Sequence, residues 1–140
     1  MGLNTSRIWL GGLAGGVAWT IWGAALGMTV LGPRYPAMQA AGLFLKESRY
    51  PFFAGQWILT LFVIAILLAH LYAWSRATLG AGPATAIKIG AIVGFAAGFP
   101  SNLAQAAWSP VPRIFPLIWM LDLWVGCIIA TVVAGWMYRD

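Results

Sequence analysis

Charge is scarce in this sequence, and acidic charge is the scarcest of all. Of 140 residues, 8% are charged, with eight lysines and arginines against three aspartates and glutamates, while 61% are hydrophobic. A soluble globular domain carries charge on about a quarter of its residues. The composition therefore excludes an ordinary soluble domain and indicates an integral membrane protein.

Cysteine and histidine each occur only once, as Cys127 and His70. A single cysteine excludes an intrachain disulfide and a metal site built from several cysteines, and we expect Cys127 to be a small core residue. The chain also lacks a nucleophile beside a base, a pair of carboxylates and a phosphate-binding loop between a strand and a helix. We therefore expect no enzyme activity, no catalytic residues and no metal site.

The net charge of +5 is spread over loops and helix ends. Nucleic-acid-binding proteins concentrate basic residues on one face or along one helix, and this sequence has no such concentration. Basic residues beside membrane spans instead contact anionic lipid headgroups. We expect membrane lipids as partners and no nucleic acid.

Four apolar stretches cover most of the chain, at about residues 8–31, 53–74, 87–108 and 115–138. Each reaches the roughly 20 residues that cross about 30 Å of hydrocarbon as a helix. The sequence therefore predicts an all-α integral membrane four-helix bundle, with residues 1–140 forming a single transmembrane domain.

The connections between these stretches differ in length. The first contains a segment bounded by Pro36 and Pro51, in which apolar residues recur at helical spacing, and it predicts a short helix on the membrane surface. The other two connections are short and rich in glycine and proline. They predict that the second and third spans, and the third and fourth, are antiparallel neighbours.

Small residues recur every fourth position along three of the predicted spans. Helices in a membrane associate by close packing, and small residues let their backbones approach. Positions four apart form an inclined ridge on a helix, which suits a crossing between two helices. We expect these stripes to be packing faces: Gly90, Gly94 and Gly98; Gly11, Gly15, Gly23 and Gly27, interrupted by Trp19; and Gly126, Ala130 and Ala134.

Two polar residues extend these stripes. Asn102 follows Gly98 at the same spacing, and Asp122 precedes Gly126. Because the third and fourth spans are predicted to be antiparallel, both polar side chains fall in the half of the bilayer nearest their connecting loop. We predict a hydrogen bond between them, within an intramembrane polar cluster that consists of Asp122, Asn102, Gln56 and Thr60.

Asp122 is the main candidate for a functional residue, because an acid inside a membrane span is costly. At 1.5 Å per residue it lies about 12 Å from the start of its span. With a single such acid and an amide partner, we favour a structural clamp between two helices over a proton or substrate site. The alternative is a polar passage formed by Asp122, Asn102 and Gln56.

His70 is the candidate ligand for a haem or a chlorophyll-type pigment, with Trp74 one turn away. A haem with two histidine ligands needs a second histidine, and bulky Ile66 in the preceding turn restricts the space for a macrocycle. The simpler interpretation is an interfacial histidine that is hydrogen-bonded to water or to the backbone. We favour this interpretation and expect no cofactor.

Two segments, "SRIWLGGLAGGVAWTIWGAALG" and "LYAWSRATLGAGPATAIKIGAIVGFAAGFP", resemble a loose group of small bacterial four-helix inner-membrane proteins that have no assigned function. The resemblance rests on glycine spacing and helix order, and it implies a bacterial inner (plasma) membrane and an accessory role. Four spans place both termini on one side, and Arg7, directly before the first span, indicates that this side is cytoplasmic.

Three functions follow from these observations. The first is a non-catalytic accessory or scaffold subunit that packs against other membrane protein subunits or against itself. The second is a small oligomeric transporter or channel unit that uses Asp122. The third is a pigment or haem carrier centred on His70.

Overall fold

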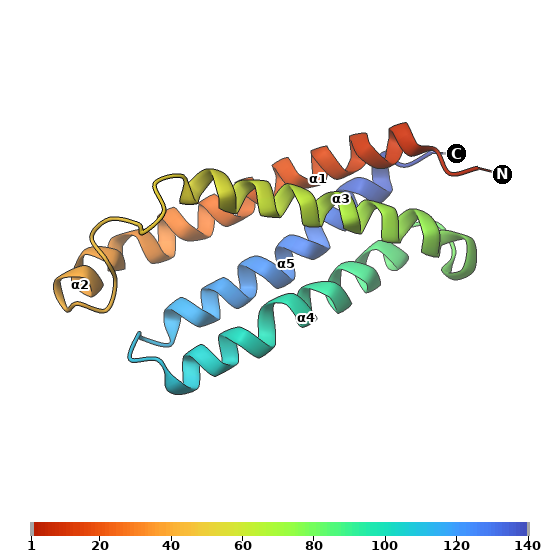
Figure 1. Cartoon of the computed structure of the whole chain (residues 1–140). Coiled ribbons are helices and arrows are strands. Elements are labelled where there is room, and N and C mark those ends of the chain that lie inside the picture. The colour runs from red at the N-terminus through yellow and green to blue at the C-terminus, as the bar shows by residue number, and fades with distance from the viewer. Residues whose placement is uncertain (1, 140) are drawn as a thin grey trace.

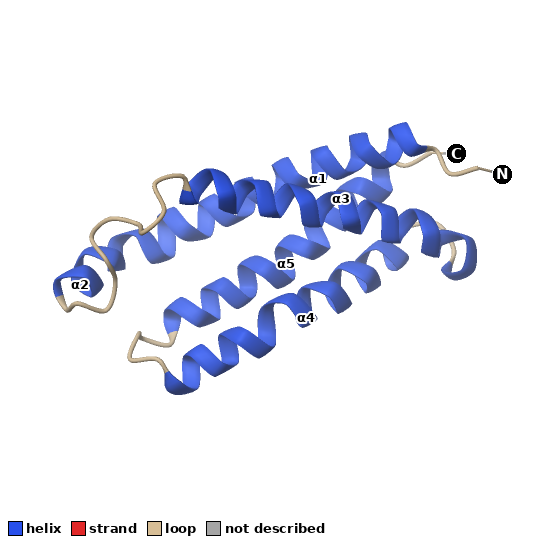
Figure 2. Ribbon diagram, viewed as in Figure 1, coloured by secondary structure: helices blue, strands red, loops and turns tan. Residues whose placement is uncertain are grey.

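The computed structural model describes residues 2–139, and this part of the chain is helical apart from its loops, with no strand (Figures 1 and 2). Four helical stretches are long and apolar enough to cross a membrane. The predicted all-helical four-helix bundle is therefore confirmed. The α-helices are α1 (Thr5–Leu26), α2 (Tyr35–Ala40), α3 (Phe53–Leu79), α4 (Pro83–Trp108) and α5 (Ile114–Met137).

α5 is the helix around which the other spans pack. It contacts α1, α3 and α4, and Figure 1 shows it running between the α1 and α3 pair and α4. Close approach is allowed because the α5 residues that are buried from Gly126 onwards have small side chains, which lower the separation at which two backbones meet. These residues are Gly126, Cys127, Ala130, Thr131 and Ala134.

The turn between α3 and α4 is tight, as its glycines predict. Gly80 and Gly82 have φ angles of 88° and 128°, in a region that residues with a side chain rarely adopt. The Thr85 hydroxyl donates to the Gly80 carbonyl at 2.7 Å, and the Tyr72 hydroxyl accepts from the Gly82 N–H at 3.0 Å. Pro83 then begins α4, where its missing N–H has no consequence.

Both ends of the described chain lie at the same end of the bundle (Figure 1). The backbone N–H of Asn4 donates to the Tyr138 hydroxyl at 3.2 Å, and the Asn4 side-chain amide donates to the Arg139 carbonyl at 3.2 Å. The Asn4 side chain also caps α1 by accepting from the Arg7 N–H, which satisfies one of the free donors at a helix start. The first and last spans are thereby joined at their ends.

The first connection differs from its prediction. α1 continues through a π-helical turn (Gly27–Leu31) and a 3-10 turn (Gly32–Arg34) into α2, which ends at Ala40. Helix therefore accounts for only the first part of the segment between Pro36 and Pro51, and the predicted surface helix is too long. Gly42, with a φ of 77°, stops it, because a left-handed residue terminates a helix.

The rest of this connection folds back over the end of the bundle. Phe44 contacts Tyr35 and Phe115, with ring centroids 5.6 Å and 5.1 Å apart, and it also contacts Trp119. The Phe44 ring is partly buried in this aromatic cluster, which removes apolar area from water and favours the folded-back loop. The loop therefore covers the bundle instead of lying beside it.

Candidate functional site

The glycine stripes of α4 and α1 face α5, as expected for packing faces. A Cβ added at Gly90 would lie 2.6 Å from the Ile128 Cα, and one added at Gly15 would lie 2.6 Å from the Ala130 carbonyl oxygen. Such distances leave no room for a side chain. The positions that pack in this way are Gly90, Gly94 and Gly98 on α4 and Gly11 and Gly15 on α1.

A second glycine row on α1 packs against α3 and was not predicted. A Cβ at Gly12 would lie 2.7 Å from the Ile66 Cα, and one at Gly16 would lie 2.5 Å from the Phe62 ring. The signal was present as the two adjacent pairs in "GGLAGG", since neighbouring residues on a helix face different directions. α1 is therefore held between α5 and α3 by two glycine rows.

Gly27 is the exception among the predicted packing positions. A Cβ added there would meet no atom within 4 Å. Gly27 lies past the end of α1, where the π-helical turn begins. Gly27 lines a cavity instead of a helix contact.

Trp19 connects the α1 stripe to the buried acid. Its side chain is fully buried and lies over Gly126, where an added Cβ would overlap the indole. From this position the indole Nε1 donates to Asp122 Oδ1 at 3.1 Å. Gly126 thus makes the space that lets Trp19 reach an acid one turn earlier on α5.

Asp122 is 8% exposed, and Trp19 satisfies only one of its two oxygens. Within the described residues Oδ2 has no hydrogen-bond donor. Gly23 leaves room beside it, since an added Cβ there would lie 3.2 Å from Oδ2. The carboxylate therefore has an unsatisfied acceptor about 12 Å along α5 from its start.

The predicted hydrogen bond between Asn102 and Asp122 is wrong. The Asn102 Nδ2 donates to the Gly98 carbonyl, one turn earlier on its own helix, at 2.6 Å. An asparagine in a helix can satisfy its amide locally in this way. Because Nδ2 must face a carbonyl, the Asn102 Oδ1 points elsewhere, and no described residue donates to it; Asn102 is 7% exposed.

The other two members of the predicted polar cluster lie apart from Asp122. Gln56 and Thr60 are exposed on α3, and the Thr60 hydroxyl donates to the Gln56 carbonyl at 2.9 Å. Neither lines the cavity beside Asp122. Gln56 and Thr60 were predicted to lie at a similar depth in the membrane to Asp122, but they do not line the same cavity.

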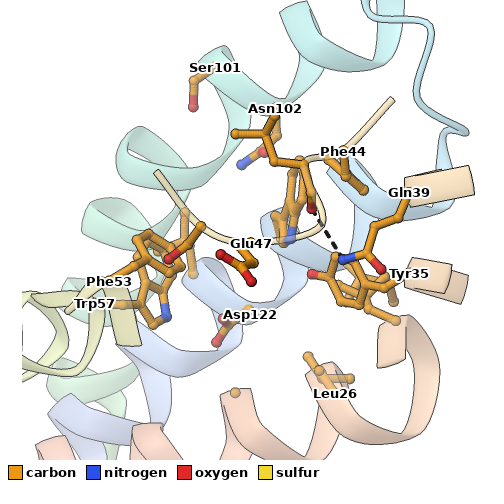
Figure 3. Close-up of a pocket in the computed structure, with 18 of the residues that line it drawn as sticks. Leu26, Tyr35, Gln39, Phe44, Glu47, Phe53, Trp57, Ser101, Asn102 and Asp122 are labelled. Carbon is orange, nitrogen blue, oxygen red and sulfur yellow. Dashed lines mark hydrogen bonds between the residues drawn. The ribbon is translucent and has the colours of Figure 1, made fainter. Parts of the chain in front are cut away.

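Asp122 and Asn102 lie in the wall of a cavity of about 810 Å³, which we name the Asp122 cavity (Figure 3). It opens between the starts of α3 and α5 and the ends of α1 and α4, at the end of the bundle opposite the termini. Its walls are mainly apolar and aromatic, with a few polar side chains among them. The aromatic side chains are Tyr35, Phe44, Phe53, Trp57 and Trp119.

The folded-back loop forms the mouth of this cavity. Lys46, Glu47 and Ser48 line it, and the loop is held by Gln39, whose side-chain amide donates to the Leu45 carbonyl at 3.2 Å. Figure 3 shows Glu47 and Gln39 on the loop side of the cavity and Asp122 on the helix side. The charged groups that line the cavity are thus two carboxylates and one ammonium.

His70 lies outside the Asp122 cavity. Its Nδ1 is 2.8 Å from the Ile66 carbonyl, and its ring packs between Trp9 and Trp74, with centroids 6.2 Å and 5.8 Å away. A bond to the backbone carbonyl fits the simpler of the two sequence interpretations. Within residues 2–139 no three histidine, cysteine or acidic side chains cluster closely enough to hold a metal ion.

No protein-family model, curated protein or solved structure matches this chain. The function of the Asp122 cavity must therefore follow from its own residues. Asp122 is buried, has a hydrogen-bond donor on only one of its two oxygens, and lies beside a cavity large enough for a small molecule. Helix packing alone does not require this arrangement.

Proposed function

We propose that this multi-pass membrane protein binds a small amphiphilic molecule in the Asp122 cavity, as a binding or transport unit of the membrane. The observation that carries the proposal is Asp122 Oδ2, an unsatisfied carboxylate oxygen beside a cavity of about 810 Å³. Ligand sites are typically mainly apolar pockets of about 300–1,000 Å³ with a few placed polar groups. The Asp122 cavity has this composition and size.

A purely structural role accounts for only one of the two carboxylate oxygens of Asp122. The contact between Trp19 and Asp122 Oδ1 joins α1 to α5, as a clamp would. A clamp uses neither Oδ2 nor the Asn102 Oδ1, and both atoms belong to residues in the cavity wall. A ligand with N–H or O–H donors can satisfy both atoms.

The accessory-subunit hypothesis is the second candidate, and it must now rest on surfaces other than the glycine stripes. Most of those glycines face other helices of the same chain, which leaves few of them for a partner. The features that favour it are the large exposed aromatic residues at opposite ends of the bundle, Trp108 at 90% and Trp136 at 79% exposure. Such residues anchor a helix at the membrane interface or contact a partner.

We also propose the type of membrane and the orientation of the chain in it. Arg7, in the first turn of α1, supports cytoplasmic termini, and the membrane we propose is a bacterial inner membrane. With that orientation, the Asp122 cavity opens towards the periplasmic side. A molecule could then enter from the outer half of the bilayer or from the periplasm.

Native mass spectrometry of protein released from native membranes in mild detergent tests the proposed function. We expect a small-molecule adduct on the wild-type chain that is lost in Gly27→Leu, because Gly27 lines the cavity and has open space for a side chain. Gly55→Leu is the matched control, since Gly55 also has open space but lies outside the cavity wall. A bare chain that carries a second protein in constant ratio would instead support the accessory subunit.

A further inference from the structure

We infer that the ligand of the Asp122 cavity is a protonated amine that carries an apolar or aromatic body. The inference rests on the proposed function and adds the chemical class of the ligand. It is carried by the two unsatisfied acceptors, the charges that line the cavity and the aromatic walls.

Two residues of the cavity wall carry an acceptor atom to which no described residue donates. Asp122 Oδ2 and Asn102 Oδ1 belong to residues that are more than nine-tenths buried. The Trp19 N–H is bound to Oδ1, and the Asn102 amide N–H is bound to the Gly98 carbonyl. A ligand that satisfies these two atoms must therefore bring N–H or O–H donors.

The net charge of the residues that line the cavity favours a cation among the ligands that carry such donors. Asp122 and Glu47 contribute two negative charges and Lys46 one positive charge, which leaves a net charge of −1 in the cavity wall. The single positive group, Lys46, belongs to the loop at the mouth. A carboxylate or phosphate ligand beside these acceptors would face Asp122, whereas an ammonium group would pair with it through charge-assisted hydrogen bonds.

The aromatic walls fit the rest of such a molecule. Trp57 stacks on Phe53, with centroids 6.3 Å apart, and Trp119 packs with Phe44 at 6.3 Å. Aromatic faces attract a cation within about 6 Å and also bury an alkyl or aryl body. The acid and these rings lie around one space (Figure 3).

Equilibrium binding to the purified full chain in zwitterionic lipid nanodiscs tests the inference with four probes: decylamine, decyltrimethylammonium, decanol and decanoate. We expect decylamine to bind to the cavity about tenfold or more tightly than decanol and decanoate, because a hydrogen bond to a charged group of this strength corresponds to at least that ratio. Decyltrimethylammonium, which has the charge but no N–H donor, should fall between them. Partition into the lipid is subtracted with empty nanodiscs.

Three variants separate the possible outcomes. Asp122→Asn keeps an acceptor for Trp19 and should lower decylamine affinity about tenfold while changing decanol affinity little. Gly27→Leu should weaken all four probes, and Gly55→Leu should weaken none. If decanol or decanoate binds as tightly as decylamine and Gly27→Leu removes that binding, the amine class is overturned while the proposed function stands. If Gly27→Leu changes no probe, the proposed function fails and the inference fails with it.

Discussion

The substitution Gly126→Ala should destabilise the bundle far more than its size suggests. The added methyl group would overlap the indole of Trp19, and that indole is fully buried. It cannot move aside without displacing the helices around it. A single methyl group at this position should therefore disturb α1, α5 and the hydrogen bond to Asp122 together.

Two contributions set the magnitude. Extra atoms in a well-packed core cost about 1–3 kcal/mol. Displacing the Trp19 Nε1, which is 3.1 Å from Asp122 Oδ1, leaves a buried acceptor unsatisfied and costs about 1–3 kcal/mol more. We expect the free energy of unfolding of Gly126→Ala to fall by at least about 2 kcal/mol.

Titration with sodium dodecyl sulfate in mixed micelles, followed by circular dichroism, measures this free energy. Gly55→Ala is the matched control, because a Cβ there meets no atom within 4 Å and alanine favours a helix by about 0.5–1 kcal/mol over glycine. The control should unfold at the same or higher detergent fraction than the wild type. Equal unfolding of the two variants would refute the packing of Trp19 on Gly126.

Three further substitutions test neighbouring contacts by the same titration. Trp19→Phe keeps a ring over Gly126 but removes the N–H, and should lower the free energy of unfolding by about 1–3 kcal/mol; an unchanged value would mean that the bond to Asp122 contributes nothing. Gly12→Ala should destabilise, because its Cβ would lie 2.7 Å from the Ile66 Cα, and stability equal to wild type would count against the α1 and α3 contact. Asn102→Ala should cost no more than about 1.5 kcal/mol, since the Asn102 amide donates only to a carbonyl of its own helix, and a larger loss would show an interhelical contact.

The spans were predictable because hydrophobicity alone determines them. Four apolar stretches of sufficient length leave few alternatives in a membrane, and the structure starts and ends the spans within a few residues of the predicted limits. The glycine spacing likewise identified the α4 face that packs on α5. These features depend on local sequence and need no knowledge of partners.

The contacts of individual polar groups were harder to predict. Depth along a span placed Asn102 near Asp122, but only the rotation of α4 and the bond to the Gly98 carbonyl decide where the amide points. The partner of Asp122 is Trp19, 103 positions away in sequence, and its reach depends on the space above Gly126. In the sequence, Trp19 interrupts the glycine stripe of α1. In the structure, its indole fills the space that Gly126 leaves on α5.

The prediction for the first connection was wrong for a similar reason. Helical spacing of apolar residues predicted a surface helix, yet Gly42 ends α2 early and Phe44 finds a cluster of aromatic rings at the end of the bundle. Tertiary burial therefore outweighed local periodicity. The same loop forms the mouth of the Asp122 cavity, so the cavity itself was not visible from the sequence.

An experimental structure of the chain, purified from native membranes and crystallised in a lipid phase without added ligand, is the decisive measurement. The proposed function predicts electron density for a small molecule in the Asp122 cavity, within hydrogen-bond distance of Asp122 Oδ2. A cavity that is filled by side chains of the loop, or that holds only water between Asp122 and the outside, would contradict it.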